Sequence, residues 1–340
     1  MKFESYMSDF KDKRVAITGG TGSFGSEFVE FLTTTEVSEV LILSRDESKQ
    51  DLSRVRFKDD RISYKICDVR DFDATNRSLK DVDFVFHAAA LKQVPACEFN
   101  AMEAVKTNIL GSNNVINACV DNNISKAVML STDKAVQPVN AMGMSKAMME
   151  KIAIGQAFLD NKTVFSVTRY GNVMGSRGSV IPIFVDKILK GEELLVTDPN
   201  MTRFMMSLQE SVDLVVYALI NSMQGELLVQ KAPAATLEVL VAALELIFNT
   251  KANVRIIGPR HAEKTHEVLL SSEESARAVE LDGFYKVSPD TRGLDYSSGT
   301  KVPPVGFEFN SSNTLMLSPT ELADLLIKLP FMSRYIDASI

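Results

Sequence analysis

Residues 14–25 read RVAITGGTGSFG, and this stretch decides the fold. The run at 14–18 predicts a buried strand, and helical spacing of apolar residues follows over 26–33. The glycines between them let the chain turn tightly and bring backbone N–H groups against a pyrophosphate. The pattern indicates a dinucleotide-binding turn, with a merely structural glycine turn as the alternative. The residues assigned to this turn are Gly19, Thr21, Gly22, Ser23, Phe24 and Gly25.

Strand-like and helix-like segments alternate after this stretch. Such alternation implies right-handed crossovers and a mainly parallel sheet covered on both faces. We therefore predict an α/β fold, a Rossmann-type doubly wound parallel sheet with a smaller α/β substrate-binding lobe. The strand-like runs lie at 40–44, 62–67, 84–88, 127–131, 164–169 and 226–230, and the helical patterns at 71–80, 102–122 and 143–159.

The rhythm loosens after about residue 175. We assign residues 1–175 and about 205–232 to the dinucleotide-binding domain, and residues 176–204 and 233–340 to the lobe. The later helices are expected at 179–190, 207–221 and 237–248, and short strands at 194–197 and 254–257, whereas 281–312 shows no periodicity.

Composition excludes several other classes of protein. The net charge of −7 comes from interspersed charges, so no basic face for nucleic acid stands out. We find no apolar run of the ~20 residues that a membrane span needs, and no apolar core of a signal peptide near the N-terminus. The three cysteines lack CxxC spacing and the three histidines lie in separate contexts, so no metal site is expected. We expect a cytoplasmic enzyme.

The end of the second strand indicates the cofactor. Ser44, Arg45 and Lys49 offer a hydroxyl and two cations, which suit the 2′-phosphate of NADP. Asp46 keeps NAD as the less favoured alternative, and a solvated charged turn is the other. The remaining residues assigned to the cofactor follow the third and fourth strands or lie in the next helix: Asp68, Val69, Ala88, Ala89, Ala90 and Asn108.

The segment after the fifth strand resembles the extended short-chain dehydrogenase/reductase family. That family's YxxxK motif supplies an acid/base tyrosine and a lysine that holds the nicotinamide ribose. Here Lys146 is present, but Met142 stands at the tyrosine position. A thioether cannot carry a proton at neutral pH.

Longer segments sharpen the resemblance: residues 87–95 read HAAALKQVP, 131–151 read STDKAVQPVNAMGMSKAMMEK, 169–180 read RYGNVMGSRGSV and 198–204 read DPNMTRF. They are similar to bacterial UDP-N-acetylglucosamine 4,6-dehydratases that invert C5. More closely, they resemble the branch with methionine at the tyrosine position, the dehydratase/5-epimerases of capsule and O-antigen synthesis. The resemblance implies UDP-N-acetylglucosamine as substrate and a homo-oligomer, with a hexamer as the suggested state.

The reaction of that branch begins with hydride transfer from C4 of the hexose to NADP. The 4-ketone acidifies C5–H, the C6 hydroxyl leaves as water, and hydride returns to C6. Protonation of C5 from the opposite face gives UDP-2-acetamido-2,6-dideoxy-β-L-arabino-hex-4-ulose. C3 can epimerise as well, because the ketone also acidifies C3–H. Such a product is a first step toward a surface-polysaccharide sugar such as N-acetyl-L-fucosamine.

Asp133 and Lys134 match the branch's catalytic pair. Protonated Asp133 would protonate the departing C6 oxygen. Neutral Lys134 would take the C5 proton, if burial and neighbouring cations lower its pKa. A plain ion pair at a strand end is the alternative.

Four further residues are assigned to catalysis: Lys146, Thr132, Met142 and Cys97. Lys146 would hold the ribose and relay the C4 hydroxyl proton through Thr132 or water. Met142 marks the branch but carries no proton. Cys97 would protonate C5 on its second face, with buried packing as an equal alternative.

The UDP moiety needs anion-binding groups. Arg203 and Arg260 are candidates for bidentate phosphate clamping. Ala262 stands where the branch usually has glycine. The resemblance adds four substrate-binding residues: Lys92, Asn172, Val180 and Glu263.

Two other functions stay open. A UDP-sugar 4-epimerase of the same superfamily is the first, although simple 4-epimerisation depends on tyrosine. A non-catalytic NADP-binding regulator is the second, suggested only by the missing tyrosine.

Overall fold

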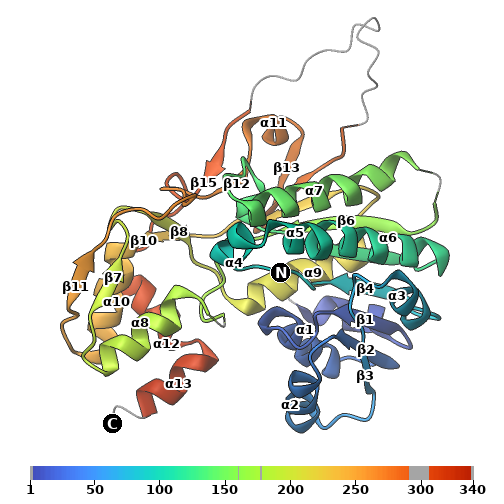
Figure 1. The fold of residues 1–340 in the computed structure, drawn as a ribbon, viewed down its shortest axis with the longest axis horizontal. Helices are drawn as coiled ribbons and strands as arrows, with labels where there is room; N and C mark the ends of the chain where they lie inside the picture. Colours follow the sequence, from blue (N-terminus) through green and yellow to red (C-terminus); the bar gives the residue numbers. More distant parts are fainter. Residues whose placement is uncertain (1–2, 160, 177, 291–305, 338–340) are drawn as a thin grey trace, which may run out of the picture.

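The computed structural model describes residues 3–159, 161–176, 178–290 and 306–337. Its centre is a nine-stranded sheet (Figure 1). Neighbouring strands from β3 to β9 pair in parallel, while the hairpin β13–β14 at the other edge is antiparallel. This arrangement confirms the predicted α/β fold. From one edge to the other the strands are β13 (Ala278–Leu281), β14 (Phe284–Val287), β9 (Leu227–Gln230), β6 (Val164–Arg169), β5 (Lys126–Leu130), β4 (Phe84–His87), β1 (Arg14–Thr18), β2 (Glu39–Ser44) and β3 (Ile62–Ile66).

The strand order changes direction beside β1. Ile17 of β1 lies opposite Ile42 of β2 on one side and Phe86 of β4 on the other. The chain therefore builds outward to β3, crosses back to β4 and continues in the other direction. In a doubly wound sheet this switch point opens a crevice at the carboxyl ends of the strands, where ligands bind.

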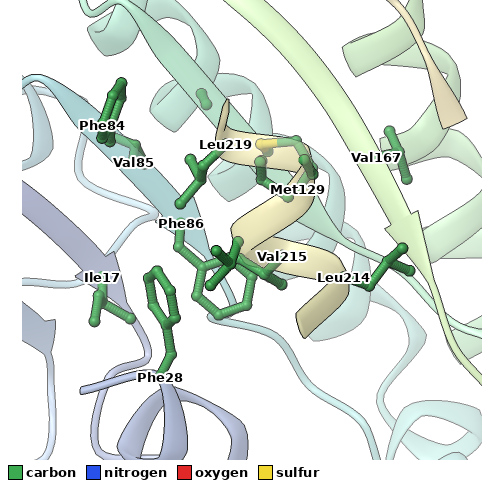
Figure 2. Packing of buried hydrophobic residues seen from close by; sticks show 14 of the residues in the cluster. Ile17, Phe28, Phe84, Val85, Phe86, Met129, Val167, Leu214, Val215 and Leu219 are labelled. Carbon is green, nitrogen blue, oxygen red and sulfur yellow. The ribbon is translucent and has the colours of Figure 1, made fainter. Parts of the chain in front are cut away.

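Helices cover both faces of the sheet, because the buried strands are apolar on both sides. On one face α1 packs against α9, and on the other α3, α6 and α7 lie side by side. Figure 2 shows Phe28 of α1 and Val215 of α9 around Phe86 of the sheet, and the Phe28 and Phe86 rings are 5.2 Å apart. The main helices around the large sheet are α1 (Ser23–Thr33), α2 (Glu47–Phe57), α3 (Phe72–Ser78), α6 (Gly111–Asp121), α7 (Ala141–Gly155) and α9 (Leu208–Asn221).

A second apolar cluster lies in the smaller group of elements beside the sheet (Figure 1). Leu240 and Leu244 of α10 pack there with Leu322 and Leu326 of α12, one helical turn apart on each helix. These elements are helices α8 (Val180–Leu189), α10 (Leu237–Phe248), α12 (Pro319–Ile327) and α13 (Pro330–Asp337), with the strand pairs β7 (Leu194–Val196) and β11 (Val254–Ile256), and β8 (Thr202–Phe204) and β10 (Ala234–Thr236).

Two segments differ from the prediction. The helix expected over 102–122 is three pieces, because a π-helical turn at η2 (Val105–Leu110) separates α5 (Ala101–Ala104) from α6. Residues 278–287, assigned to the lobe, instead form the β13–β14 hairpin on the large sheet. Their pairing with β9 is remote in sequence and left no local pattern. The division into two domains otherwise stays a prediction.

Short elements complete the described chain. They are η1 (Phe3–Phe10), α4 (Val94–Phe99), η3 (Asp133–Ala135), η4 (Gln156–Phe158), α11 (Ser272–Ser275), and the paired strands β12 (Val268–Leu270) and β15 (Phe309–Asn310). Among the described residues, no helix has the length and apolar character needed to cross a membrane.

Candidate functional site

A cleft of about 770 Å³ opens at the carboxyl ends of β1, β2, β3, β4, β5 and β6. Its walls are the loops that follow these strands. The residues predicted from sequence that line it are Gly19, Thr21, Gly22, Ser23, Phe24, Gly25, Ser44, Arg45, Lys49, Asp68, Val69, Ala88, Ala89, Ala90, Lys92, Thr132, Lys134, Met142, Lys146 and Asn172. The predicted residues that are not part of this lining are Cys97, Asn108, Asp133, Val180, Arg203, Arg260 and Glu263.

The glycine turn presses against the loop after β4. Gly19 has φ +68°, and a Cβ there would come within 2.8 Å of the Ala89 backbone nitrogen. Gly22 caps α1 without a side-chain hydrogen bond to the first turn. A helix N-terminus that has no side-chain cap and is reached through glycine fits a phosphate group, which its N–H groups and dipole attract.

Charged groups surround the end of β2. Thr21 Oγ1 lies 3.0 Å from Ser44 Oγ, which ties the glycine turn to this strand. Arg45 Nη1 lies 3.8 Å from an Asp68 oxygen, and Lys49 Nζ lies 2.6 Å from Asp46 Oδ2. Both cations are about half exposed at the rim of the cleft. An anion entering there would meet a hydroxyl and two cations whose present partners are carboxylates.

Asn108 has a positioning role in this structure. Its amide accepts a hydrogen bond from Leu91 N at 2.8 Å and donates to Leu91 O at 2.9 Å. It also donates to Ser145 Oγ on α7 at 2.9 Å. The side chain is fully buried and fixes the loop after β4 against α7. Asn108 therefore shapes one wall of the cleft from behind.

Asp133 and Lys134 follow β5 on the short helix η3. Lys134 Nζ lies 3.1 Å from Asp133 Oδ1, and Thr132 Oγ1 donates to the same oxygen at 2.7 Å. Asp133 is buried, and its backbone N–H donates to Tyr170 O at 2.7 Å. A second carboxylate, that of Glu267, lies 3.2 Å from Lys134 Nζ. Lys134 thus lies between two carboxylates.

The pKa expected for Lys134 is wrong in direction for the free protein. Burial acts to lower this pKa, as does the charge of Arg203. The carboxylates of Asp133 and Glu267 act the other way and outweigh both, so the pKa of Lys134 is raised above its usual value. At neutral pH Lys134 is therefore an ammonium.

Lys146 differs from Lys134. Burial lowers its pKa to about 8, against a smaller opposing effect of the Glu150 carboxylate. Its Nζ donates to Leu130 O at 2.6 Å, and Glu150 is largely committed to Arg169, whose Nη2 lies 2.6 Å away. Lys146 therefore sits near the balance between charged and neutral forms at mildly alkaline pH.

Met142 and Cys97 lie together in a small apolar cluster. Met142 lines the cleft, whereas Cys97 is fully buried, with Sγ 3.9 Å from Leu91 O. Burial raises the pKa of the Cys97 thiol, with a smaller contribution from Glu98. This surrounding favours packing, one of the two alternatives for Cys97.

Two of the residues assigned to UDP, Arg203 and Glu263, form an ion pair. Arg203 Nη2 on β8 lies 3.1 Å from Glu263 Oε1, and the backbone N–H of Arg260 donates to Glu263 Oε2 at 3.3 Å. The Arg260 side chain is exposed. Ala262 has φ +57°, a left-handed conformation that glycine adopts without strain.

Asn172 follows β6 and lines the cleft, whereas Val180 is not part of the lining. The Oδ1 atom of Asn172 is buried without a hydrogen-bond partner among the described residues. Val180 is the first residue of α8. A buried amide oxygen that lines a cleft is suited to accept a hydrogen bond from a ligand.

Several groups at the site were not predicted from the sequence. Glu267 and Lys264 both influence the charge at Lys134, and Gln93 lines the cleft. Glu267 lies in the same segment as Arg260 and Glu263, which was the available signal. Among the described residues, no group of three or more His, Cys, Asp or Glu side chains is arranged to hold a metal ion.

A parallel sheet in this order, with a glycine turn after its central strand, defines the class of Rossmann-type α/β proteins. Residues 15–289 match the family described as "Polysaccharide biosynthesis protein", and the chain belongs to that family.

Individual relatives extend this result. A Rickettsia bellii protein named UDP-glucose 4-epimerase is 50% identical over 335 residues, covering 96% of this chain and 98% of its own. The X-ray structure of Pen from Bacillus thuringiensis is 34% identical, with a TM-score of 0.86, covering 94% of this chain and 98% of its own. The structure of DesIV, a dTDP-glucose 4,6-dehydratase from Streptomyces venezuelae with NAD and TYD bound, shares the fold at 22% identity and a TM-score of 0.68, covering 74% of this chain and 86% of its own.

Proposed function

We propose that the protein is an NADP-dependent UDP-N-acetylglucosamine 4,6-dehydratase that inverts C5. One observation carries the proposal: the Asp133–Lys134 pair follows β5 at the cleft, with Met142 and Lys146 on the adjoining helix. Membership of the polysaccharide biosynthesis family and the resemblance of these segments to inverting dehydratases support it.

The fit of a nicotinamide nucleotide follows from the cleft itself. The glycine turn and the N-terminus of α1 would hold the pyrophosphate, and Ser44, Arg45 and Lys49 the adenosine phosphate. DesIV, of similar fold, was solved with NAD, which supports a nicotinamide cofactor. When bound, this group supplies reversible hydride transfer to and from the sugar. Lys146, on the cleft wall, would hold the nicotinamide ribose.

Proton transfer along the hydrogen bond between Lys134 and Asp133 would produce the neutral lysine and the protonated aspartic acid that the reaction needs. Moving one proton across the 3.1 Å between Nζ and Oδ1 makes a neutral amine and a protonated carboxyl. Enclosure by a bound sugar favours this neutral pair, because desolvation disfavours charge. The amine then takes the C5 proton, and the carboxyl gives its proton to the C6 oxygen as the C6–O bond breaks and water leaves. The pair returns to ammonium and carboxylate.

The product formed from UDP-N-acetylglucosamine in D₂O tests the proposal. We expect NMR to show a 6-deoxy-4-keto sugar nucleotide with deuterium at C5 and inverted configuration there. Deuterium at C3 as well would add the proposed C3 epimerisation. A hexose that keeps its C6 hydroxyl would contradict the proposal.

A UDP-sugar 4-epimerase is the second candidate, because the Rickettsia bellii relative bears that name. The same experiment separates the two functions. An epimerase would yield the 4-epimer without deuterium at C5, since no C5 proton leaves.

We also propose a homo-oligomer. Met144 and Met148 lie one turn apart on α7 and are exposed, as are Phe99 of α4 and Met102 of α5 nearby. Exposed apolar side chains on helices that contact one another favour contact with another copy. Light scattering should give a mass well above the 37.5 kDa of one chain, and a single-chain mass at micromolar concentration would contradict this.

A further inference from the structure

Glu267 is a buried carboxylate next to the catalytic pair that the reaction described above does not use. It directly precedes β12, and only 3% of the residue is exposed. Ser311 fixes its backbone, because Ser311 Oγ accepts from Glu267 N at 2.9 Å and Ser311 N donates to Glu267 O at 2.8 Å. These bonds fix the backbone from which the carboxylate extends toward Lys134.

Its two oxygens have different surroundings. Oε1 lies 3.2 Å from Lys134 Nζ, on a side chain that is 22% exposed. Oε2 is buried and has no hydrogen-bond partner among the described residues. A buried carboxylate that has a partner for only one of its two oxygens lowers the stability of the fold, so its charge is expected to have a use at that position.

The other charges around Lys134 show what that use is. Asp133 is the second carboxylate on Lys134, and the cations that act on Lys134 or Glu267 are Arg203 and Lys264. Arg203 is committed to Glu263, and Lys264 Nζ donates to Val136 O at 2.6 Å. When Asp133 holds a proton, Glu267 is thus the carboxylate left within ion-pair distance of Lys134.

We propose that Glu267 is the positioning residue of this site: it holds Lys134 in place and is the counter-ion of the ammonium that forms when Lys134 takes a proton while Asp133 is neutral. The catalytic part of this inference rests on the proposed function, whereas the ion pair does not. Glu267 would make Lys134 a stronger base toward C5–H, since its charge stabilises the protonated amine. The raised pKa of Lys134 agrees with this role.

The charge on Lys134 can be measured without any substrate. Acetic anhydride acylates only neutral amines. The folded protein is labelled at several pH values and then digested, and mass spectrometry of the peptides gives the extent of labelling at each lysine. The pH dependence of this labelling reports the protonation of the lysine. Lys251, whose side chain is 91% exposed, is the internal reference. In the wild type, labelling of Lys134 should reach half its maximum at a higher pH than labelling of Lys251. A lower pH for Lys134 would overturn the proposal, and this arm needs no variant.

The variant Glu267→Gln keeps the shape and removes the charge. At pH 8 the labelling rate of Lys134 relative to Lys251 should rise about tenfold, which corresponds to one pKa unit. Glu280→Gln, which removes an exposed carboxylate 2.5 Å from Lys231, is the matched control and should leave the ratio unchanged. An unchanged ratio in a folded Glu267→Gln protein would also overturn the proposal.

Turnover separates this inference from the proposed function. Glu267→Gln should lower kcat about tenfold or more with KM within about threefold, and Glu267→Asp should recover part of kcat. If labelling responds but UDP-N-acetylglucosamine is not dehydrated by the wild type, the proposed function fails and the ion pair stands. If dehydration occurs but neither labelling nor kcat responds, the inference alone fails.

Discussion

The two ends of the cleft are built in different ways. The glycine turn is one continuous segment, in which Gly19 and Gly22 shape the backbone and the α1 N-terminus follows directly. The Asp133–Lys134–Glu267 cluster joins η3 to the residue before β12, far along the chain. A backbone site depends on the absence of side chains, whereas an assembled site depends on the balance of charges between distant segments. Substitutions should therefore break the first by steric conflict and tune the second by charge.

The largest effect is expected at the glycine turn. Gly19→Ala adds a Cβ 2.8 Å from Ala89 N at a positive φ, so the turn or the loop after β4 must move. We expect nicotinamide nucleotide binding to weaken about 100-fold or more, because under the proposed function the backbone N–H groups of this turn would bind the pyrophosphate. Isothermal titration calorimetry measures the affinity of the wild type and the variant for the nucleotide.

Gly155→Ala is the matched control, since a Cβ there meets nothing within 4 Å. It should keep the wild-type affinity. Equal affinities for both variants would show that the glycine turn does not hold the cofactor.

A smaller effect is expected where the site is assembled from side chains. Arg203→Ala removes the guanidinium paired with Glu263 at 3.1 Å. We expect KM for the UDP-sugar to rise about 30-fold, as for the loss of a charge-assisted phosphate contact, while nucleotide cofactor affinity stays within threefold. Steady-state kinetics measures KM for the UDP-sugar, and calorimetry measures the cofactor affinity. Arg255→Ala, on exposed β11, is the control and should leave both quantities unchanged. A loss of cofactor affinity in Arg203→Ala would contradict the separation of the cofactor end of the cleft from the UDP-sugar end.

Lys146 predicts a pH effect on stability. Its pKa is lowered to about 8 in the folded protein, so between that pH and about 10.4 the unfolded chain binds more protons. Stability therefore rises with pH through this window, and the penalty for the charged form is fully present below it. Relative to Lys146→Met, the wild-type free energy of unfolding should increase by about 2 kcal/mol across the window. Urea unfolding at several pH values measures this difference, and a flat difference would contradict the lowered pKa.

The smallest effect is expected at Cys97. Its thiol is buried behind the cleft lining. Cys97→Ala should change kcat less than threefold and lower stability by about 1 kcal/mol, through a small cavity. Loss of C5 deuterium incorporation in that variant would instead assign the second C5 proton to Cys97.

The sequence predicted what depends on local pattern. Periodicity and spacing over short segments predicted the strands and the glycine turn, whereas the Asp133–Lys134 pair was assigned by resemblance to a known family. The pairing of β13–β14 with β9 could not be predicted, because no local signal reports a partner so distant. The predicted direction of the Lys134 pKa shift was wrong for the same reason, because the second carboxylate, Glu267, comes from a different part of the chain. Asn108 was assigned to the cofactor, but it lies behind the cleft lining, and its bonds to Leu91 could not be predicted from the sequence.

Under the proposed function, the hydrogen taken from C4 of the sugar as hydride returns to C6 of the same molecule. UDP-N-acetylglucosamine deuterated at C4 tests it, with the product examined by NMR and mass spectrometry. We expect one deuterium in the C6 methyl group of a 4-keto product. Deuterium retained at C4 of an unchanged or epimerised hexose would contradict it.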